Sequence, residues 1–204
     1  YHGVAIVSRI PFTEQASHDF CAKGDCRHVS VRLNTPAPTV VHNFYIPAGG
    51  DEPDPAINEK FAHKLSFLDE LKSWTTSKAR PDGHEAILVG DLNIAPLTED
   101  VWSHKDLLKV VSHTPIECEA LLAIQKAGGW HDVMRKHVPP SEKLYTWWSY
   151  RAKDWLAADR GRRLDHVWTS EKLAERSTGI QVLKEARGWQ QPSDHVPVIA
   201  RFST

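Results

Sequence analysis

The run Ile87-Leu88-Val89-Gly90-Asp91-Leu92-Asn93 joins an apolar strand pattern to a glycine and then to two polar side chains. Aliphatic residues bounded by turn residues predict a strand over 86–89. Asp91 and Asn93 are two positions apart, so in an extended segment their side chains point the same way. We therefore expect them to reach one substrate or metal ion from the tip of the strand. An Asx turn that caps the loop is the alternative explanation for this spacing.

Strand and helix patterns continue on both sides of this segment. Further strands are expected at 3–8, 28–33, 39–46, 163–169, 180–183 and 196–202. Helical spacing of apolar residues predicts helices over 58–73 and over 115–127, the second with Thr114 as N-cap and Pro115 at the first helical position. The mixture predicts sheet layers covered by helices, an α/β or α+β sandwich. No repeat or linker divides 1–204, so we expect a single domain.

The composition is that of a globular protein with a core. Of the 204 residues, 41% are hydrophobic and 25% are charged, which excludes collagen-like, coiled-coil and disordered chains. No stretch approaches the roughly 20 apolar residues of a membrane span, and the start lacks a signal-peptide pattern. We therefore expect a cytoplasmic monomer without a membrane partner. Cys21, Cys26 and Cys118 are expected to be reduced thiols, because neither a disulfide framework nor a four-ligand zinc site has this spacing.

Charge is distributed unevenly along the chain, although the net charge is only -1. Residues 135–204 contain 13 Lys and Arg against 8 Asp and Glu, and they also contain five of the 8 Trp. Basic side chains interleaved with aromatic rings favour a nucleic-acid backbone with sugars or bases to pack against. A solvated basic face above core tryptophans is the alternative.

Two more polar motifs lie beside strand patterns. In Arg163-Leu164-Asp165-His166-Val167 a carboxylate interrupts an apolar run, and a buried Asp is costly unless it is paired or bound to metal. Alternation along the strand directs His166 to the opposite face, where we expect a structural histidine. In Ser193-Asp194-His195-Val196-Pro197 a carboxylate and an imidazole meet at a loop–strand junction. Such a histidine can act as a general acid or base, or hold a phosphate.

The ordered motifs G-D-x-N, R-x-D-H and S-D-H-x-P resemble those of the endonuclease/exonuclease/phosphatase superfamily, which has a deoxyribonuclease-I-like fold. The segments GVAIVSR (3–9), NFYIPAG (43–49), YTWWSYR (145–151) and GRRLD (161–165) are similar to its exonuclease III branch, the apurinic/apyrimidinic endonucleases. The resemblance extends from Tyr1 to Phe202. It implies a four-layer α/β/β/α sandwich.

The resemblance implies a metal-dependent phosphodiesterase of base-excision repair. Such an enzyme cuts double-stranded DNA 5′ to an abasic site and has 3′-to-5′ exonuclease and 3′-repair activities. Mg²⁺ is the implied cofactor, with Mn²⁺ as a substitute. Two alternatives stay open, a superfamily phosphatase that acts on a small phosphorylated substrate and a catalytically inactive DNA-binding fragment.

The resemblance also implies a role for each motif residue. Asp91 would orient or deprotonate the attacking water, and Asn93 would hold that water and the phosphate. Tyr45 would donate to the phosphate. Doubly protonated His195 would stabilise the phosphorane, held by Asp194 and paired with Asp165. Asp91, Asp194 and His195 are the implied metal-site residues.

DNA contacts are implied on the same basis. Trp147 and Leu164 match walls of a pocket for a flipped-out abasic sugar, whereas Arg162 stands where a relative has an aromatic wall. The basic balance of residues 135–204, rather than the resemblance, makes Arg151, Lys153, Arg160 and Arg162 the expected backbone contacts, with solvated surface charges as the alternative.

The start of the chain differs from the family pattern. It begins at Tyr1 without an initiator Met, whereas the resemblance implies about 60 to 70 preceding residues in a domain of this size. Those residues would include a strand that ends in Asn and a glutamate metal ligand. We therefore expect a fragment whose sheets lack their first strands.

Overall fold

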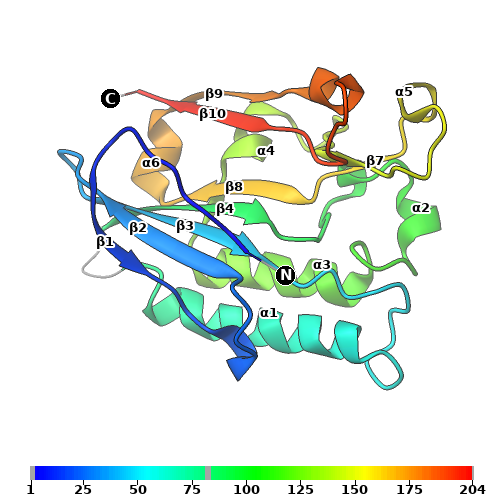
Figure 1. Cartoon of the computed structure of the whole chain (residues 1–204), viewed down its shortest axis with the longest axis horizontal. Helices are drawn as coiled ribbons and strands as arrows, with labels where there is room; N and C mark the ends of the chain where they lie inside the picture. Colours follow the sequence, from blue (N-terminus) through cyan, green and yellow to red (C-terminus); the bar gives the residue numbers. More distant parts are fainter. Residues whose placement is uncertain (1–2, 81–83, 204) are drawn as a thin grey trace.

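A six-stranded mixed sheet forms the centre of the molecule in the computed structural model, which describes residues 3–80 and 84–203 (Figure 1). Its strand order is β1-β2-β3-β4-β8-β5, and only β3 and β4 run parallel. The strands are β1 (Phe12–Ala16), β2 (His28–Leu33), β3 (Thr39–Tyr45), β4 (Glu85–Asp91), β5 (His131–Asp132) and β8 (Asp165–Thr169). The central strands β3, β4 and β8 end or begin at the edge where the polar motifs lie.

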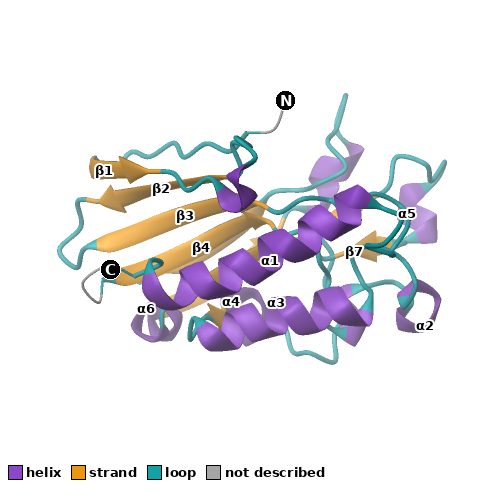
Figure 2. Cartoon of the chain, turned by 90° about the horizontal axis from the view of Figure 1, so that it is seen from below, coloured by secondary structure: helices purple, strands orange, loops and turns teal. Residues whose placement is uncertain are grey.

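Helices α1 (Glu59–Ser77) and α3 (Pro115–Ala127) cover one face of this sheet (Figure 2). The side chain of Asn58 caps α1 by accepting from the Lys60 N–H, and Thr114 forms a capping box with Glu117 at the start of α3. The apolar stripes of both helices are buried against β3 and β4, in a core with Phe44, Leu71, Leu88, Leu121 and Trp168.

A second, two-stranded sheet lies on the other side of the central sheet. It consists of β9 (Ser177–Val182) and β10 (Val198–Phe202), which pair antiparallel. Its inward side chains, among them Val182 and Phe202, pack with Val89 and Val167. The outward positions include the exposed Gln181 and Arg201 and also the partly exposed Ile199.

Short elements connect these layers. They are η1 (Phe20–Ala22), η3 (Thr98–Asp100), α2 (His104–Leu107), α4 (Val133–His137), β6 (Trp147–Trp148), α5 (Trp155–Ala158), β7 (Gly161–Arg162), α6 (Glu171–Arg176) and η4 (Lys184–Gly188). None of the described helices is long and apolar enough to cross a membrane. The three cysteines are free thiols.

The structure confirms the mixed α/β class and both helices, with α1 extending to Ser77. The strand expected at 3–8 is wrong. These residues are not in a strand, Val7 is 97% exposed, and Asn43 holds the segment through one hydrogen bond to the Ala5 carbonyl. In the described part of the chain no strand lies beside the segment to complete a ladder, and strand structure without cross-strand pairing is not stable. The strand that forms instead is β1, whose five residues are all exposed.

Strand boundaries also shift near the motifs. The run expected at 163–169 begins as a strand at Asp165, and the run at 196–202 begins at Val198. Pro197 has no N–H to donate to a ladder, which explains the later start of β10.

A buried ion pair joins α1 to α3. Lys64 Nζ lies 2.5 Å from Glu117 Oε1, and both side chains are fully buried. The same ammonium donates to the carbonyls of Ala48 (3.2 Å) and Asn93 (2.8 Å). Burial lowers the pKa of Lys64, but Glu117 opposes this effect. The buried Lys64 ammonium therefore connects α1, α3 and the loops that contain Ala48 and Asn93.

We predict that Lys64→Met lowers the free energy of unfolding by about 3–5 kcal/mol, because Glu117 is left as an unpaired buried charge. The double variant Lys64→Met/Glu117→Leu should recover part of this loss. Urea unfolding monitored by circular dichroism measures both. The control is Lys72→Met, which removes an exposed lysine of the same helix; equal losses in Lys64→Met and Lys72→Met would contradict the prediction.

A second buried polar chain crosses β2 and β3. His42 Nε2 donates to the Ala79 carbonyl at 2.8 Å, so its Nδ1 accepts from Nε2 of His28 at 3.1 Å. His28 Nδ1 in turn accepts from the backbone N–H of His18. This arrangement fixes both buried imidazoles as neutral tautomers. Burial lowers the pKa of His28 to about 3 and that of His42 to about 4.

We predict that stability falls as the pH is lowered from about 6.5 to about 4, because the unfolded chain gains protons on these histidines while the folded chain does not. The free energy of unfolding falls in this direction because the pKa values of both histidines are lower in the folded chain than in the unfolded chain. The full stabilisation is therefore present above pH 6.5 and is progressively lost below it. Urea midpoints measured across this range should vary less with pH in His28→Leu/His42→Leu than in the parent protein. The control His131→Gln, an exposed residue of β5, should keep the parent slope. An unchanged slope in the double variant would overturn the assignment.

Candidate active site

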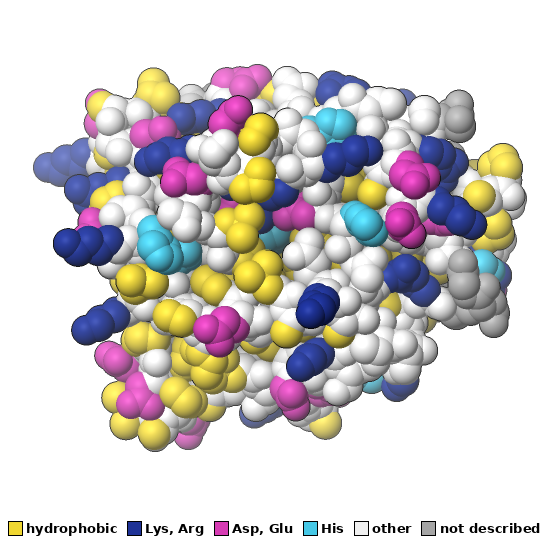
Figure 3. Space-filling view, turned by 180° about the vertical axis from the view of Figure 1, so that it is seen from behind, with side chains coloured by type: hydrophobic (Ala, Val, Ile, Leu, Met, Phe, Trp, Pro, Cys, Tyr) yellow, Lys and Arg dark blue, Asp and Glu magenta, His cyan; other side chains and the backbone are white. Residues whose placement is uncertain are grey.

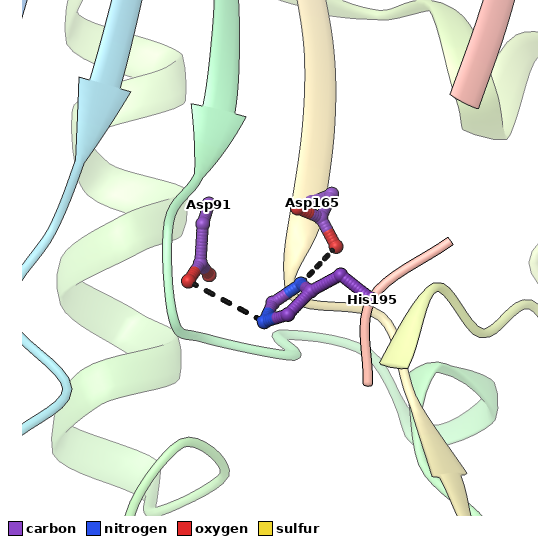
Figure 4. A group of neighbouring side chains, drawn as sticks. All are labelled: Asp91, Asp165 and His195. Atoms are coloured by element: carbon purple, nitrogen blue, oxygen red, sulfur yellow. Dashed lines mark hydrogen bonds and ion pairs between the residues drawn. The ribbon is translucent and has the colours of Figure 1, made fainter. Parts of the chain in front are cut away.

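Three titratable side chains meet at the edge of the central sheet (Figure 4). Asp91 ends β4 and Asp165 begins β8, and the two residues are cross-strand partners. His195 comes from the loop before β10. Its Nδ1 lies 2.8 Å from Asp165 Oδ2, and its Nε2 lies 3.7 Å from Asp91 Oδ2. The expected pairing of Asp165 with His195 is therefore present.

The turn after β4 fixes the direction of the Asp91 carboxylate. The Asn93 backbone N–H donates to Asp91 Oδ1 at 2.9 Å, which is an Asx turn. Asn93 Nδ2 donates to Asp91 Oδ2 and to the Ile46 carbonyl. The Asx turn expected as the alternative explanation forms, and it aims the Asp91 carboxylate at His195. Because both Nδ2 hydrogens are used within the protein, this amide holds Asp91 rather than offering a donor to a phosphate.

Gly90 permits this close packing of β4 on β3. Its φ is +135°, and a Cβ at this position would lie 2.0 Å from the Phe44 carbonyl oxygen. Only glycine fits such a backbone approach. The Gly in the G-D-x-N motif is therefore required by the backbone that carries Asp91.

Neighbouring charges shift the pKa values of the two interacting groups. Burial and the charge of Asp165 raise the pKa of Asp91 to about 7, although His195 opposes this shift. Burial lowers the pKa of His195, but the hydrogen bond and charge of Asp165, with the charges of Asp91 and Asp194, outweigh it and raise that pKa to about 9. His195 is therefore an imidazolium at neutral pH, with Nδ1–H directed to Asp165 and Nε2–H directed toward Asp91.

Asp194 lies beside His195 in the cavity wall and also contacts Trp147. Its Oδ2 accepts from Trp147 Nε1 at 2.9 Å, so it orients the indole. The hydrogen bond that fixes the His195 ring comes from Asp165 instead. Among the described residues, the group that brings candidate ligand atoms within 4.8 Å of one another consists of Asp91, Asp165 and His195. Asp194 is not a member of it.

A cavity of about 650 Å³ opens beside His195. Its lining includes the expected residues Tyr45, Asn93, Trp147, Arg151, Arg160, Arg162, Leu164 and Asp194. Lys153 is exposed and does not line it. On the back of the molecule, Lys and Arg side chains gather along the left edge in Figure 3, which is the end that carries α2 and α5 in Figure 1.

Two residues at the cavities, Trp102 and Arg27, were not identified from the sequence, because neither lies in a recognisable motif. Trp102, from the turn before α2, lines the cavity and lies beneath the Arg160 guanidinium at 4.7 Å. Trp102 stands in a mostly polar run, Asp100-Val101-Trp102-Ser103-His104, that carries no recognisable motif, so only the fold shows its position. Arg27 lies over the Tyr45 ring at 5.2 Å and donates to the Tyr45 carbonyl. A second cavity, lined partly by Lys23, Arg27, Lys60 and His63, shares Tyr45 with the first.

The comparisons with known proteins agree with this arrangement. The chain is 30% identical over 169 residues to exodeoxyribonuclease III of Haemophilus influenzae, and 36% identical over 144 residues to an exodeoxyribonuclease of Bacillus subtilis. These alignments cover 79% and 69% of this chain but only 61% and 52% of the two relatives. An AP endonuclease structure from Archaeoglobus fulgidus superposes with a TM-score of 0.86 at 28% identity, covering 97% of this chain and 73% of that one.

The family model agrees in extent with these alignments. The Endonuclease/Exonuclease/phosphatase family matches residues 1–195, which include β4, β8 and the loop that carries His195. Those segments supply the three side chains that meet at the edge of the sheet. The chain therefore belongs to the endonuclease/exonuclease/phosphatase family.

Proposed function

We propose that this protein is a metal-dependent DNA phosphodiesterase that cuts 5′ to abasic sites, with 3′-to-5′ exonuclease and 3′-repair activities. The observation that carries the proposal is the His195–Asp165–Asp91 arrangement at the mouth of a cavity with arginine and tryptophan walls. An imidazolium beside a carboxylate suits phosphodiester hydrolysis, and a basic aromatic cavity suits a displaced sugar–phosphate unit. The names of the relatives, exodeoxyribonuclease III and AP endonuclease, support the same substrate class.

His195 stabilises the negative charge that develops on the phosphate during attack. Its raised pKa keeps both ring nitrogens protonated at neutral pH. Asp165 accepts from Nδ1, so Nε2–H is held in one direction and can donate to a phosphate oxygen that gains negative charge during attack. The ring is oriented before the substrate binds, so little reorganisation is needed during the reaction.

Asp91 is the group that accepts a proton from the attacking water. Its carboxylate is fixed by two hydrogen bonds from Asn93, and a pKa near 7 places it in the range suited to a general base. Tyr45 ends β3 directly beside Asp91 and also lines the cavity. Its phenol is our candidate donor to the phosphate.

A hard divalent cation fits the oxygen donors here. Mg²⁺ in such sites is held by one or two carboxylates together with water and substrate phosphates. Asp91 and Asp165 supply carboxylate oxygens, and Asp194 lines the same edge, so these carboxylates are the ones that could hold Mg²⁺ or Mn²⁺. When bound, the cation supplies positive charge opposite the phosphate.

The direct test is cleavage of a duplex oligonucleotide that contains one abasic site, with Mg²⁺, Mn²⁺ or a chelator. We expect a single cut 5′ to the lesion, resolved on a denaturing gel, and no cut with chelator. Binding of the duplex without cleavage in either metal would instead support an inactive DNA-binding fragment. Phosphate release from small phosphorylated compounds, with intact DNA, would support the phosphatase alternative.

We predict that His195→Gln and Asp165→Asn each reduce the cleavage rate by about 100-fold or more, because the oriented imidazolium is lost. Asp91→Asn should have an effect of similar size. Fluorescence anisotropy with the same duplex should show nearly unchanged binding. His131→Gln changes an exposed histidine far from the cavity and serves as the control. Parent-like rates in all three site variants would remove these residues from the mechanism.

A further inference from the structure

Arg162 lies in a row of residues that crosses three neighbouring chain segments. Within the β6–β7 ladder Arg162 is directly opposite Trp147, and Trp147 is directly opposite His195 in an isolated bridge. Directly opposite residues of antiparallel segments have their side chains on the same face. Adjacent strands are about 4.8 Å apart, so the backbones of Arg162 and His195 are separated by roughly 10 Å. All three side chains line the cavity.

The guanidinium of Arg162 is anchored but its charge is not neutralised. Nη1 donates to Ser112 Oγ at 2.8 Å and to the Val111 carbonyl at 3.2 Å. The guanidinium lies 5.3 Å from the centre of the Trp147 ring. Nε is buried without a hydrogen-bond partner. Among the described residues, no carboxylate lies within ion-pair distance of Arg162, although the more distant charge of Glu117, which pairs with Lys64, partly opposes the effect of burial.

The neighbouring residue Arg163, in contrast, is a buried arginine whose charge is neutralised by carboxylates. Arg163 bonds both oxygens of Asp100 and also bonds Asp132. Arg162 lacks any such partner, and burial lowers its pKa. A partly desolvated cation without a counter-charge is unfavourable, and an anion relieves this cost more fully than a neutral hydroxyl does. The Arg162 side chain is therefore suited to a ligand that carries a second negative charge next to the phosphate that reacts at His195.

We propose that Arg162 binds the phosphate on the 3′ side of the residue held in the cavity. This inference rests on the proposed function, in which the phosphodiester on the 5′ side of that residue lies at His195. The 3′ phosphate is then the next anion along the strand, and Arg162 is the next cation along the row. Arg162 is thus a specificity-determining residue.

The consequence is a preference for internal lesions. A residue inside a strand carries phosphates on both sides, whereas a 3′-terminal residue has only the phosphate that is cut. Arg162 therefore gains a charge-assisted hydrogen bond with an internal abasic residue and none with a terminal one. The side chain shifts the balance toward endonuclease cleavage and away from exonuclease cleavage.

Three duplex substrates test this proposal. The first carries an internal abasic residue, the second carries the same residue with a neutral methylphosphonate at its 3′ linkage, and the third ends in an abasic residue at its 3′ terminus. For the parent protein we expect kcat/KM to be about 10- to 100-fold higher on the first substrate than on the other two, the size of one charge-assisted hydrogen bond. Arg162→Met should lose this advantage, so its kcat/KM should fall much more on the first substrate than on the other two.

The controls separate the possible failures. Arg162→Lys keeps the charge and should retain part of the preference, whereas Arg201→Met, an exposed arginine on β10, should behave as the parent. Thermal unfolding of each variant reports loss of folding. An equal fall on all three substrates in a folded Arg162→Met protein would overturn the proposal and assign the residue to the sugar or to the shape of the cavity. A parent protein that cuts none of them refutes the proposed function itself, whereas parent cleavage with no effect of Arg162→Met refutes only this inference.

Discussion

The buried pair between Lys64 and Glu117 is the constraint on which the site depends. Each of the three hydrogens of the ammonium has an acceptor, namely Glu117, the Ala48 carbonyl and the Asn93 carbonyl. Glu117 also accepts from the Ser112 N–H. The pair thus fixes the loop after β3, the loop after β4 and the loop before α3 against two helices. A buried charge tolerates little displacement of its partners, so these loops form a rigid border for the cavity.

That rigidity extends to both ends of the residue row. Ser112, held by Glu117, accepts from Arg162 at one end. Asn93, held by Lys64, fixes Asp91 opposite His195 at the other end. Arg163 adds a second buried network, because its bonds to Asp100 and Asp132 hold the chain between β7 and β8. The distance between the imidazolium and the cation of Arg162 is therefore set by the fold rather than by flexible side chains.

The sequence predicted the elements whose stability is local and missed those that depend on neighbours. Helix 115–127 was predicted at its observed bounds because its Thr114 cap and its apolar stripe are both written in consecutive residues. The pattern at 3–8 was equally strand-like, but strand formation requires a paired neighbour. Asp165 and His195 are 30 positions apart, and only family resemblance joined them. Trp102 could not be assigned to the cavity, because its flanking sequence carries no motif and its place depends on contacts with distant segments such as Arg160.

The signs of the charges around the cavity explain why the arrangement needs more than its own side chains. Asp91 and Asp165 face one imidazolium, and a pKa near 7 leaves Asp91 only partly ionised at neutral pH, so this end carries little net charge to attract a phosphate. The Arg162 guanidinium lies beyond the Trp147 ring, about two strand spacings away. Under the proposed function, a divalent cation would supply positive charge where the phosphodiester reacts, and Arg162 would bind the neighbouring phosphate. Two positive charges separated along the row would then match a substrate with two consecutive phosphates.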